Sequence, residues 1–370
     1  MRMSSIADAL LLHNEKASGA TTLRFWVAAA VIVYHSFGMS GNTMTGVPPN
    51  VAHGLGQLIL VPMFIALSGF LLAASATRAQ DLRKFTVNRA LRIFPALVVL
   101  TLVTTLVVGP IVTTLPLSEY FTDRRFWRYL LVSVSWINFD LPGVFLTHPA
   151  SGIVNPSLWS IPVELQCYAA LMAMMLMGFM QRRHYVLLAW VLVLALTLIP
   201  FVMSGNRGAH FHVTRFLVQF PYFMTGVVIY LYRDRVPRHL GIFWACISLA
   251  AILMMLGWYK ALLPIAVAYC VVYIATGPLP KPPGLPDGDY SYGIYLYGGL
   301  VQQLVLFLST PPYAWWLTVI LALPITFTCA IASWHLVEQP ALKLKVVINR
   351  NKQQPQSLSR DRMGTTARAR

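Results

Sequence analysis

The sequence predicts an all-α, polytopic integral membrane bundle with about ten transmembrane helices. Hydrophobic residues make up 57% of its 370 residues and charged residues only 11%, whereas a soluble domain carries about 25% charged residues. The apolar residues gather in ten stretches of roughly the 20 residues that a helix needs to cross a bilayer. The basic residues fall mainly between these stretches, which indicates membrane topology rather than a nucleic-acid-binding face. The expected partner is therefore the lipid bilayer and not a nucleic acid.

Ten stretches are expected to form the transmembrane helices. They are residues 23–40, 56–76, 93–112, 157–179, 185–203, 214–232, 240–258, 260–278, 290–309 and 315–337. They define a membrane domain over 23–342, preceded by a cytoplasmic segment, 1–22, and followed by a basic cytoplasmic tail, 343–370, which is expected to be disordered. The longest connection, 113–156, has an aromatic middle, 126–139, that is too short to cross and is expected to lie in the membrane interface or to re-enter.

The basic residues predict the orientation of the bundle. Ten crossings place both termini on one side, and most of the 28 lysines and arginines fall on that side, including those between Arg78 and Arg92. The positive-inside rule then predicts that both termini are cytoplasmic. The four cysteines lie in apolar stretches without the spacing of zinc ligands, so no metal is expected.

The first apolar stretch, from Leu23 to Phe37, carries two ionisable side chains, Arg24 and His35. They are eleven residues apart, which in an α-helix places them on one face, about 16 Å apart along the axis. Ionisable groups inside a membrane span are costly and are candidates for function. The alternative is a neutral imidazole that bonds a backbone carbonyl in the core; Arg24 on the same face favours a functional role for His35.

Two arginines, Arg89 and Arg92, lie three residues apart before a long apolar stretch and are therefore neighbours on one helical surface. A pair of guanidiniums at the mouth of a helix suits bidentate binding of phosphate. Positive-inside anchoring, or contact with lipid phosphates, is the alternative explanation of the same pair.

The segment from Asn155 to Tyr168 carries a carboxylate, Glu164, one or two turns into a helix. Pro162 in its opening turns frees backbone groups that need a cavity or a partner helix. A buried carboxylate there could hold a hydroxyl group or orient a base. It could also pair with an arginine such as Arg215, and the two roles are compatible.

Six segments of the apolar body carry distinctive residues in a particular order. They are Arg24 with His35 eleven positions later; Val61 to Leu71, containing Leu67-Ser68-Gly69-Phe70; Arg89-x-x-Arg92 with Ile93-Phe94-Pro95; Ser157-Leu158-Trp159-Ser160 through Glu164; Ser291-Tyr292-Gly293-Ile294-Tyr295-Leu296; and Val337-Glu338-Gln339-Pro340. Together they resemble the motifs of the membrane acyltransferase family 3, which includes bacterial O-acetyltransferases of surface and exported polysaccharides. The resemblance covers the chain from Leu23 to about Leu342.

The resemblance implies a function: transfer of an acyl group, most often acetyl, from acyl-CoA to a hydroxyl of a carbohydrate such as an exopolysaccharide, an O-antigen or a lipid-linked glycan. It implies a multi-pass protein of the bacterial inner (cytoplasmic) membrane, acetyl-CoA or another acyl-CoA as co-substrate, and glycan-synthesis or export proteins as partners. The residues that it assigns are catalytic His35 and Glu164; acyl-CoA-binding Arg24, Arg89 and Arg92; acceptor-binding Ser157, Trp159 and Tyr168; and structural Ser68, Tyr292 and Glu338. His35 is expected to be either a general base or a transient acyl carrier.

Two positions depart from the family pattern. Many members have Trp-His where this chain has Tyr297-Gly298, and often a tyrosine where it has Leu97. Any role of a histidine at Gly298 is therefore lost or supplied by another residue.

Two other functions fit the same residues. A buried set of His, Glu and Arg would also suit a proton-coupled transporter of a glycan or small acid without covalent chemistry, although no inverted repeat with paired broken helices points to transport. A sensor or scaffold with a degenerate acyltransferase body is the third interpretation, and Gly298 is its main support.

Overall fold

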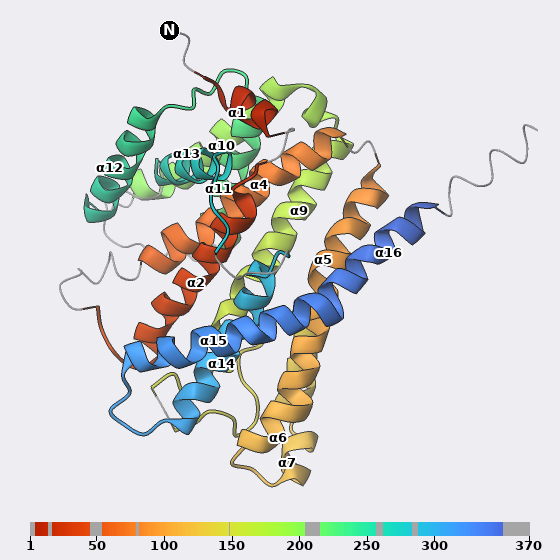
Figure 1. Ribbon diagram of the computed structural model, residues 1–370, viewed down its shortest axis with the longest axis vertical. Helices are drawn as coiled ribbons and strands as arrows, with labels where there is room; N and C mark the ends of the chain where they lie inside the picture. The colour runs from red at the N-terminus through yellow and green to blue at the C-terminus, as the bar shows by residue number, and fades with distance from the viewer. Residues whose placement is uncertain are drawn as a thin grey trace, which may run out of the picture.

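The computed structural model describes residues 4–13, 17–44, 54–78, 81–147, 149–203, 215–256, 262–282 and 288–350 (Figure 1). Within these ranges every regular element is a helix, and the only strand-like pairing is an isolated bridge between Ser5 and Pro237. The predicted all-α fold is therefore confirmed.

Six helical segments are long and apolar enough to cross a membrane. They are α2 (Ala20–Met39); η1 (Leu55–Leu60) with α4 (Val61–Arg78); α5 (Leu82–Val103) with η2 (Thr104–Val108) and α6 (Gly109–Val112); η4 (Pro156–Trp159) with α9 (Ser160–Leu176); α14 (Ser291–Leu308); and α15 (Trp315–Ser333) with η6 (Trp334–Glu338) and the start of α16 (Gln339–Arg350). Each coincides with a predicted span.

Shorter apolar helices occupy the other four predicted positions. They are α10 (Arg183–Met203), α11 (Arg215–Leu231), α12 (Leu240–Leu256) and α13 (Leu263–Ala275). The number of crossings and the cytoplasmic position of the termini stay predictions. The remaining short helices are α1 (Ile6–Leu12), α7 (Leu117–Thr122), α8 (Arg124–Leu130), η3 (Leu131–Val134) and η5 (Phe179–Gln181).

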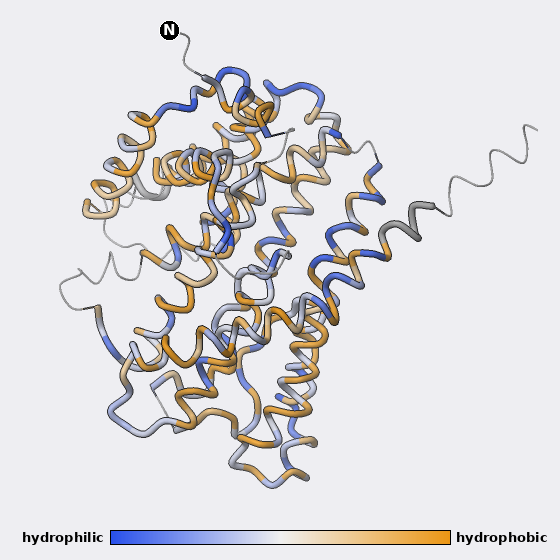
Figure 2. The backbone as a smooth tube through the Cα atoms, viewed as in Figure 1, coloured by the Kyte–Doolittle hydropathy of each residue, from blue (hydrophilic) through white to orange (hydrophobic). Residues whose placement is uncertain are grey.

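The surface of the bundle is that of a membrane protein. Figure 2 shows hydrophobic residues along most helices, with hydrophilic residues gathered in the loops near α1 and at the start of α5. Large apolar side chains stay exposed on the flanks, among them Ile111 (76%), Met255 (74%) and Leu336 (77%). Exposed apolar surface of this extent is unfavourable in water but favourable against lipid chains.

Proline explains the three π-helical turns, η1, η2 and η6. Each ends two residues before a proline: Pro62, Pro110 and Pro340. A proline has no N–H to donate and its ring crowds the carbonyl four residues earlier, so the preceding turn widens. The closing Glu338-Gln339-Pro340 motif thus produces the local geometry that holds Glu338.

Two glycines bring α4 and α11 into close contact at the centre of the bundle. A Cβ added to Gly69 of α4 would fall 2.1 Å from the Phe223 carbonyl oxygen, and one added to Gly226 of α11 would fall 2.1 Å from that of Ala66. Small residues permit such backbone approach between membrane helices. The glycine of the Leu-Ser-Gly-Phe motif therefore serves packing and fixes the direction in which the adjacent Ser68 faces.

Each of the two terminal segments contains a helix. Helix α1 begins with a capping box in which Ser5 and Asp8 satisfy each other's backbone N–H groups, and Ile6 N–H donates to the Val236 carbonyl at 3.0 Å. Helix α16 lies beside α5 and continues past residue 342 to Arg350. The rest of the predicted basic tail, 351–370, lies outside the described residues.

Candidate active site

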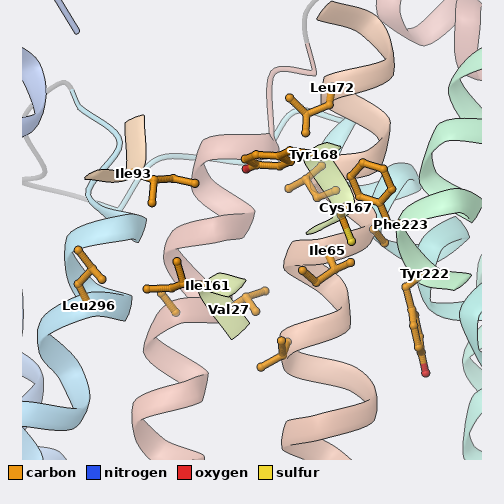
Figure 3. Packing of buried hydrophobic residues seen from close by; sticks show 14 of the residues in the cluster. Val27, Ile65, Leu72, Ile93, Ile161, Cys167, Tyr168, Tyr222, Phe223 and Leu296 are labelled. Carbon is orange, nitrogen blue, oxygen red and sulfur yellow. The ribbon is translucent and has the colours of Figure 1, made fainter. Parts of the chain in front are cut away.

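A polar pocket lies inside the bundle between α2, α4, α5, α9 and α14. Its cavity volume is about 80 Å³, and the polar residues that line it are Arg24, Ser68, Arg89, Arg92, Ser160, Glu164, Tyr168, Ser291, Tyr292 and Tyr295. Apolar walls come from neighbouring residues such as Ile65, Ile93 and Ile161, which Figure 3 shows together with Tyr168 in the buried layer. Seven of the eleven predicted site residues therefore meet in one cavity.

Four charged side chains define one end of this pocket, which we call the arginine end. Arg92 pairs with Asp289 at 2.7 Å and with Glu338 at 3.2 Å, and Arg24 pairs with the same Asp289 oxygen at 3.4 Å. The Glu338 carboxylate also accepts from the Ser333 hydroxyl at 3.0 Å. Arg92 is thus held between two carboxylates, as a charge removed from water requires.

Asp289 is the centre of the arginine end. Its second oxygen accepts from the Ser291 hydroxyl at 2.5 Å. Burial raises the pKa of Asp289, but the charges of Arg92 and Arg24 and the hydrogen bonds of Ser291 outweigh burial, and the pKa lies below its ordinary value. Asp289 is therefore ionised at neutral pH, and this contribution to stability is lost as the pH falls through its lowered pKa.

Arg89 lines the pocket one helical turn from Arg92 but differs from it in its contacts. Within the described part of the chain it forms no ion pair, and its buried Nε has no hydrogen-bond partner. A buried guanidinium N–H without a partner is unfavourable unless a ligand supplies an acceptor. Arg89 is consequently the arginine best placed to receive an anionic group.

The carboxylate of Glu164 accepts one hydrogen bond from the neighbouring helix α4 and one from its own helix, α9. Ser68 of α4 donates to it at 3.2 Å, and the Tyr168 hydroxyl, one turn along α9, donates to the same oxygen. The suggested ion pair with Arg215 is wrong, because Arg215 instead stacks over the ring of Trp159 at 5.2 Å. Glu164 thus faces the pocket with a fixed orientation.

Three other predicted residues differ in their positions relative to the pocket. The Tyr292 hydroxyl lines the pocket and donates to the Ile93 carbonyl at 2.9 Å, which ties α14 to α5. Ser157 is buried, and its backbone carbonyl accepts from the Tyr295 hydroxyl. Trp159 lies outside the pocket, in a separate groove.

His35 also lies outside this pocket. It is half-buried on α2, with its ring edge-on to that of Tyr34 at a centroid distance of 5.6 Å. The structure therefore separates the predicted catalytic histidine from the predicted catalytic carboxylate, Glu164, which faces the arginine end.

Two contacts hold α14 against its neighbouring helices near the pocket. Gln302 of α14 donates to the Ile32 carbonyl of α2 at 2.7 Å, which aligns the two helices at that depth. Tyr295 is about two turns closer to the arginine end than Gln302, and it contacts Phe64 with a ring-centroid distance of 5.9 Å. Phe64 and Tyr295 both line the pocket, whereas His35 does not.

The departure at Gly298 lies at a close contact between α14 and α2. A Cβ added there would lie 3.1 Å from the Ile32 side chain of α2. A histidine at this position would require α2 and α14 to separate or Ile32 to move. The second departure, Leu97, is fully buried in α5 and contributes to the core.

Sequence reasoning did not assign Ser160 and Ser291 to the pocket, nor Asp289 as the partner of Arg24 and Arg92. Asp289 ends a Pro/Gly-rich connection without periodicity, so nothing in the sequence indicated that it would lie close to two arginines. Its position directly before the Ser291-Tyr292 motif was the available clue.

Comparison with known proteins agrees with these observations. The fold is that of a multi-pass membrane protein with a polar pocket inside its helical bundle. A sequence model described as an acyltransferase domain matches residues 19–335. The chain therefore belongs to the membrane acyltransferase family 3, as its six motifs predicted.

Two relatives resemble the chain along nearly their whole length. Nodulation protein 10 of Rhizobium leguminosarum bv. viciae is 30% identical over 374 residues, which cover 90% of this chain and 96% of that protein. An O-acetyl transferase of Shigella phage Sf6 is 27% identical over 335 residues, covering 88% of this chain and 96% of the phage protein. No solved structure matches the chain.

Proposed function

We propose that this protein transfers an acetyl or other acyl group from acyl-CoA to a hydroxyl of a carbohydrate acceptor. One observation carries the proposal: in a chain of the acyltransferase family, Arg24, Arg89, Arg92 and the hydrogen-bonded Glu164 line the same pocket. The name of the phage relative, O-acetyl transferase, supports the same reaction.

The arginine end suits the anionic part of the donor. The unpaired Nε of Arg89 offers a charge-assisted hydrogen bond to a phosphate. A second pocket, lined in part by Ser18, Thr21 and Lys281, shares Asp289 with this end. It provides hydroxyls and a cation next to the arginines, where the nucleotide of acyl-CoA would lie. With the termini in the cytoplasm of a bacterial cell, this end faces the cytoplasmic pool of acyl-CoA.

The reaction needs a base and a path for the thioester. In the proposed step, the acceptor oxygen attacks the thioester carbonyl while the His35 imidazole takes the hydroxyl proton. The carbon–sulfur bond then breaks, the ester is released, and the proton passes from the imidazole to the departing thiolate. In the alternative, the His35 imidazole first takes the acyl group as the carbon–sulfur bond breaks, and its N–H proton passes to the departing thiolate. The acceptor oxygen then attacks this acyl group, the carbon–nitrogen bond breaks, and the hydroxyl proton returns to the imidazole.

Turnover by the purified protein tests the proposal. The full chain in lipid nanodiscs is incubated with radiolabelled acetyl-CoA and with surface glycan isolated from cells that lack the gene. We expect label to appear in the glycan as an ester that mild base releases. Movement of glycan or acid across proteoliposomes without labelling would indicate a transporter instead, and neither result would indicate a sensor or scaffold.

Replacing Arg89 by alanine is expected to raise the donor KM by about 10- to 100-fold, because a hydrogen bond to a charged group is worth about 1.5–3 kcal/mol. The acceptor KM should change little. Initial rates at varied acetyl-CoA concentration measure this effect. The matched control is Arg83→Ala, an exposed arginine near the start of the same helix. An unchanged donor KM in Arg89→Ala would exclude Arg89 from donor binding.

Replacing Glu164 by glutamine is expected to lower kcat by about 10²-fold, since the neutral amide cannot act as a proton acceptor or orient a cationic base. Tyr168→Phe, which removes one donor to the carboxylate but keeps the charge, should lower kcat less. Single-turnover rates with saturating donor distinguish the two. A Glu164→Gln enzyme with wild-type kcat would assign Glu164 to packing.

A further inference from the structure

A second groove lies on the other side of α9. Six of its residues matter here: Ser135, Trp136, Trp159, Gln166, Arg215 and Phe216. Helix α9 divides this groove from the polar pocket, because Ser160, Glu164 and Tyr168 face the pocket whereas Trp159 and Gln166 face the groove. The groove lies near the beginning of α9, toward the end of the bundle opposite the arginine end.

The groove combines exposed aromatic rings with polar side chains. Trp136 is 68% exposed. Arg215 stacks over Trp159 at 5.2 Å and, within the described residues, forms no ion pair. Stacking on a ring face leaves the N–H edge of a guanidinium directed away from the ring and open to an acceptor. Gln166 adds an exposed amide.

The loop that carries Trp136 has a residue with positive φ and is fixed by side-chain hydrogen bonds. Ser135 has a positive φ of 68°, which is uncommon for a residue with a Cβ. Asn138 fixes the loop by donating to the Arg128 carbonyl at 2.7 Å and to the Trp136 carbonyl at 3.2 Å. The Ser135 hydroxyl oxygen is buried beside the groove without a hydrogen-bond partner. Strained backbone and an unsatisfied polar atom together indicate a ligand site.

A position in the membrane interface would by itself explain one exposed tryptophan. It would not explain an arginine, an amide and an unsatisfied hydroxyl around the same hollow. Apolar ring faces with a few convergent polar groups are the composition of a binding site for an amphipathic small molecule or chain unit. A pyranose ring has this character, with an apolar C–H face and hydroxyls at its edge.

We propose that this groove binds a sugar unit of the acceptor at a distance from the reacting hydroxyl. The sugar ring lies against Trp136, and Arg215 and Gln166 bind its hydroxyl or carboxylate substituents. The inference rests on the proposed function, since it assigns a second subsite to the same acceptor. Its consequence is that binding energy from a remote sugar positions the reacting unit, so that long acceptors are used better than short ones.

Acceptors of graded length test this inference. Surface glycan from cells lacking the gene is cleaved by mild acid and separated from single repeat units to long fragments. For the wild-type chain in nanodiscs we expect kcat/KM to rise with length. Trp136→Ala and Arg215→Ala should lose about 10-fold or more on long fragments, change little on the single repeat unit, and keep the donor KM. Trp136→Phe should restore much of the loss.

Trp127 supplies the matched control. It is 60% exposed in α8 of the same connection but does not line the groove, so Trp127→Ala should behave as wild type. An equal loss on all acceptor lengths, no loss, or the same loss in Trp127→Ala would overturn the inference. Unfolding temperatures show whether the variants fold.

Direct binding separates failure of this inference from failure of the proposed function. Long fragments without donor are titrated into the wild-type and Trp136→Ala chains. Binding by the wild type that is lost in the variant supports the groove even if no acyl transfer occurs. Equal binding by both chains overturns the groove while acyl transfer remains, and preferential binding of anionic lipid over glycan would identify an interfacial lipid contact instead.

Discussion

His35→Ala is expected to lower the rate of acyl transfer by about 10²- to 10⁴-fold, the usual contribution of a general base. A transient acyl carrier would give at least this loss. His35 is the single histidine on the face of α2 that also carries Arg24, and its ring has no hydrogen-bond partner within the described residues. Ester formation on isolated glycan measures the effect.

The control for this variant is His184→Ala, which removes an exposed imidazole at the start of α10. Equal membrane yield and equal donor affinity would show that the His35 variant is folded and retains the arginine end. If His35→Ala kept full activity, the base would have to be sought within the polar pocket, where Glu164 is the available carboxylate.

Arg92→Ala is expected to lower the apparent free energy of unfolding by about 3–5 kcal/mol, because removal of one partner leaves a buried charge uncompensated. Arg92 is 18% exposed, and its partner Glu338 only 2%. Three other contacts would be lost with it: the ion pair to Asp289 and the cation–π contacts with Tyr292 at 5.5 Å and Trp334 at 5.7 Å. Unfolding of the detergent-solubilised chain, followed by intrinsic fluorescence, measures the change.

The double variant Arg92→Ala/Glu338→Ala makes this prediction specific. If Glu338 is destabilising once unpaired, the double variant should be less destabilised than the sum of the two single variants. Arg83→Ala, an exposed arginine on the same helix, should change stability little. Additive effects would show that the two side chains do not act as a pair.

The helices could be predicted because their signals are local. Apolar stretches of membrane length, the prolines and the glycines lie in the sequence itself, and all ten predicted stretches coincide with helices. Arg89 and Arg92 were predicted as neighbours because helical periodicity relates residues three apart. Most of the pocket residues could be predicted because they belong to motifs of the acyltransferase family.

The partners of these residues could not be predicted in the same way. Asp289 is 265 residues from Arg24 and 197 from Arg92 in the sequence, and no local pattern connects them. Ser68 and Glu164 are likewise 96 residues apart. Their contact depends on the closeness of α4 and α11 at Gly69 and on the angle at which α9 enters the bundle.

By itself, the sequence determined that this protein is a helical membrane protein of the acyltransferase family, with the motif arginines near one end of its helices and His35 deeper within α2. These properties could be predicted because hydrophobicity, spacing and motif order belong to the chain itself. Only the tertiary structure decided how the candidate residues are divided: Arg24, Arg89, Arg92 and Glu164 in one pocket, Trp159 in a groove behind α9, and His35 on α2 outside that pocket. The physical reason is that burial and charge pairing depend on which helix faces meet. Those faces are selected by packing over the whole bundle rather than by any single helix.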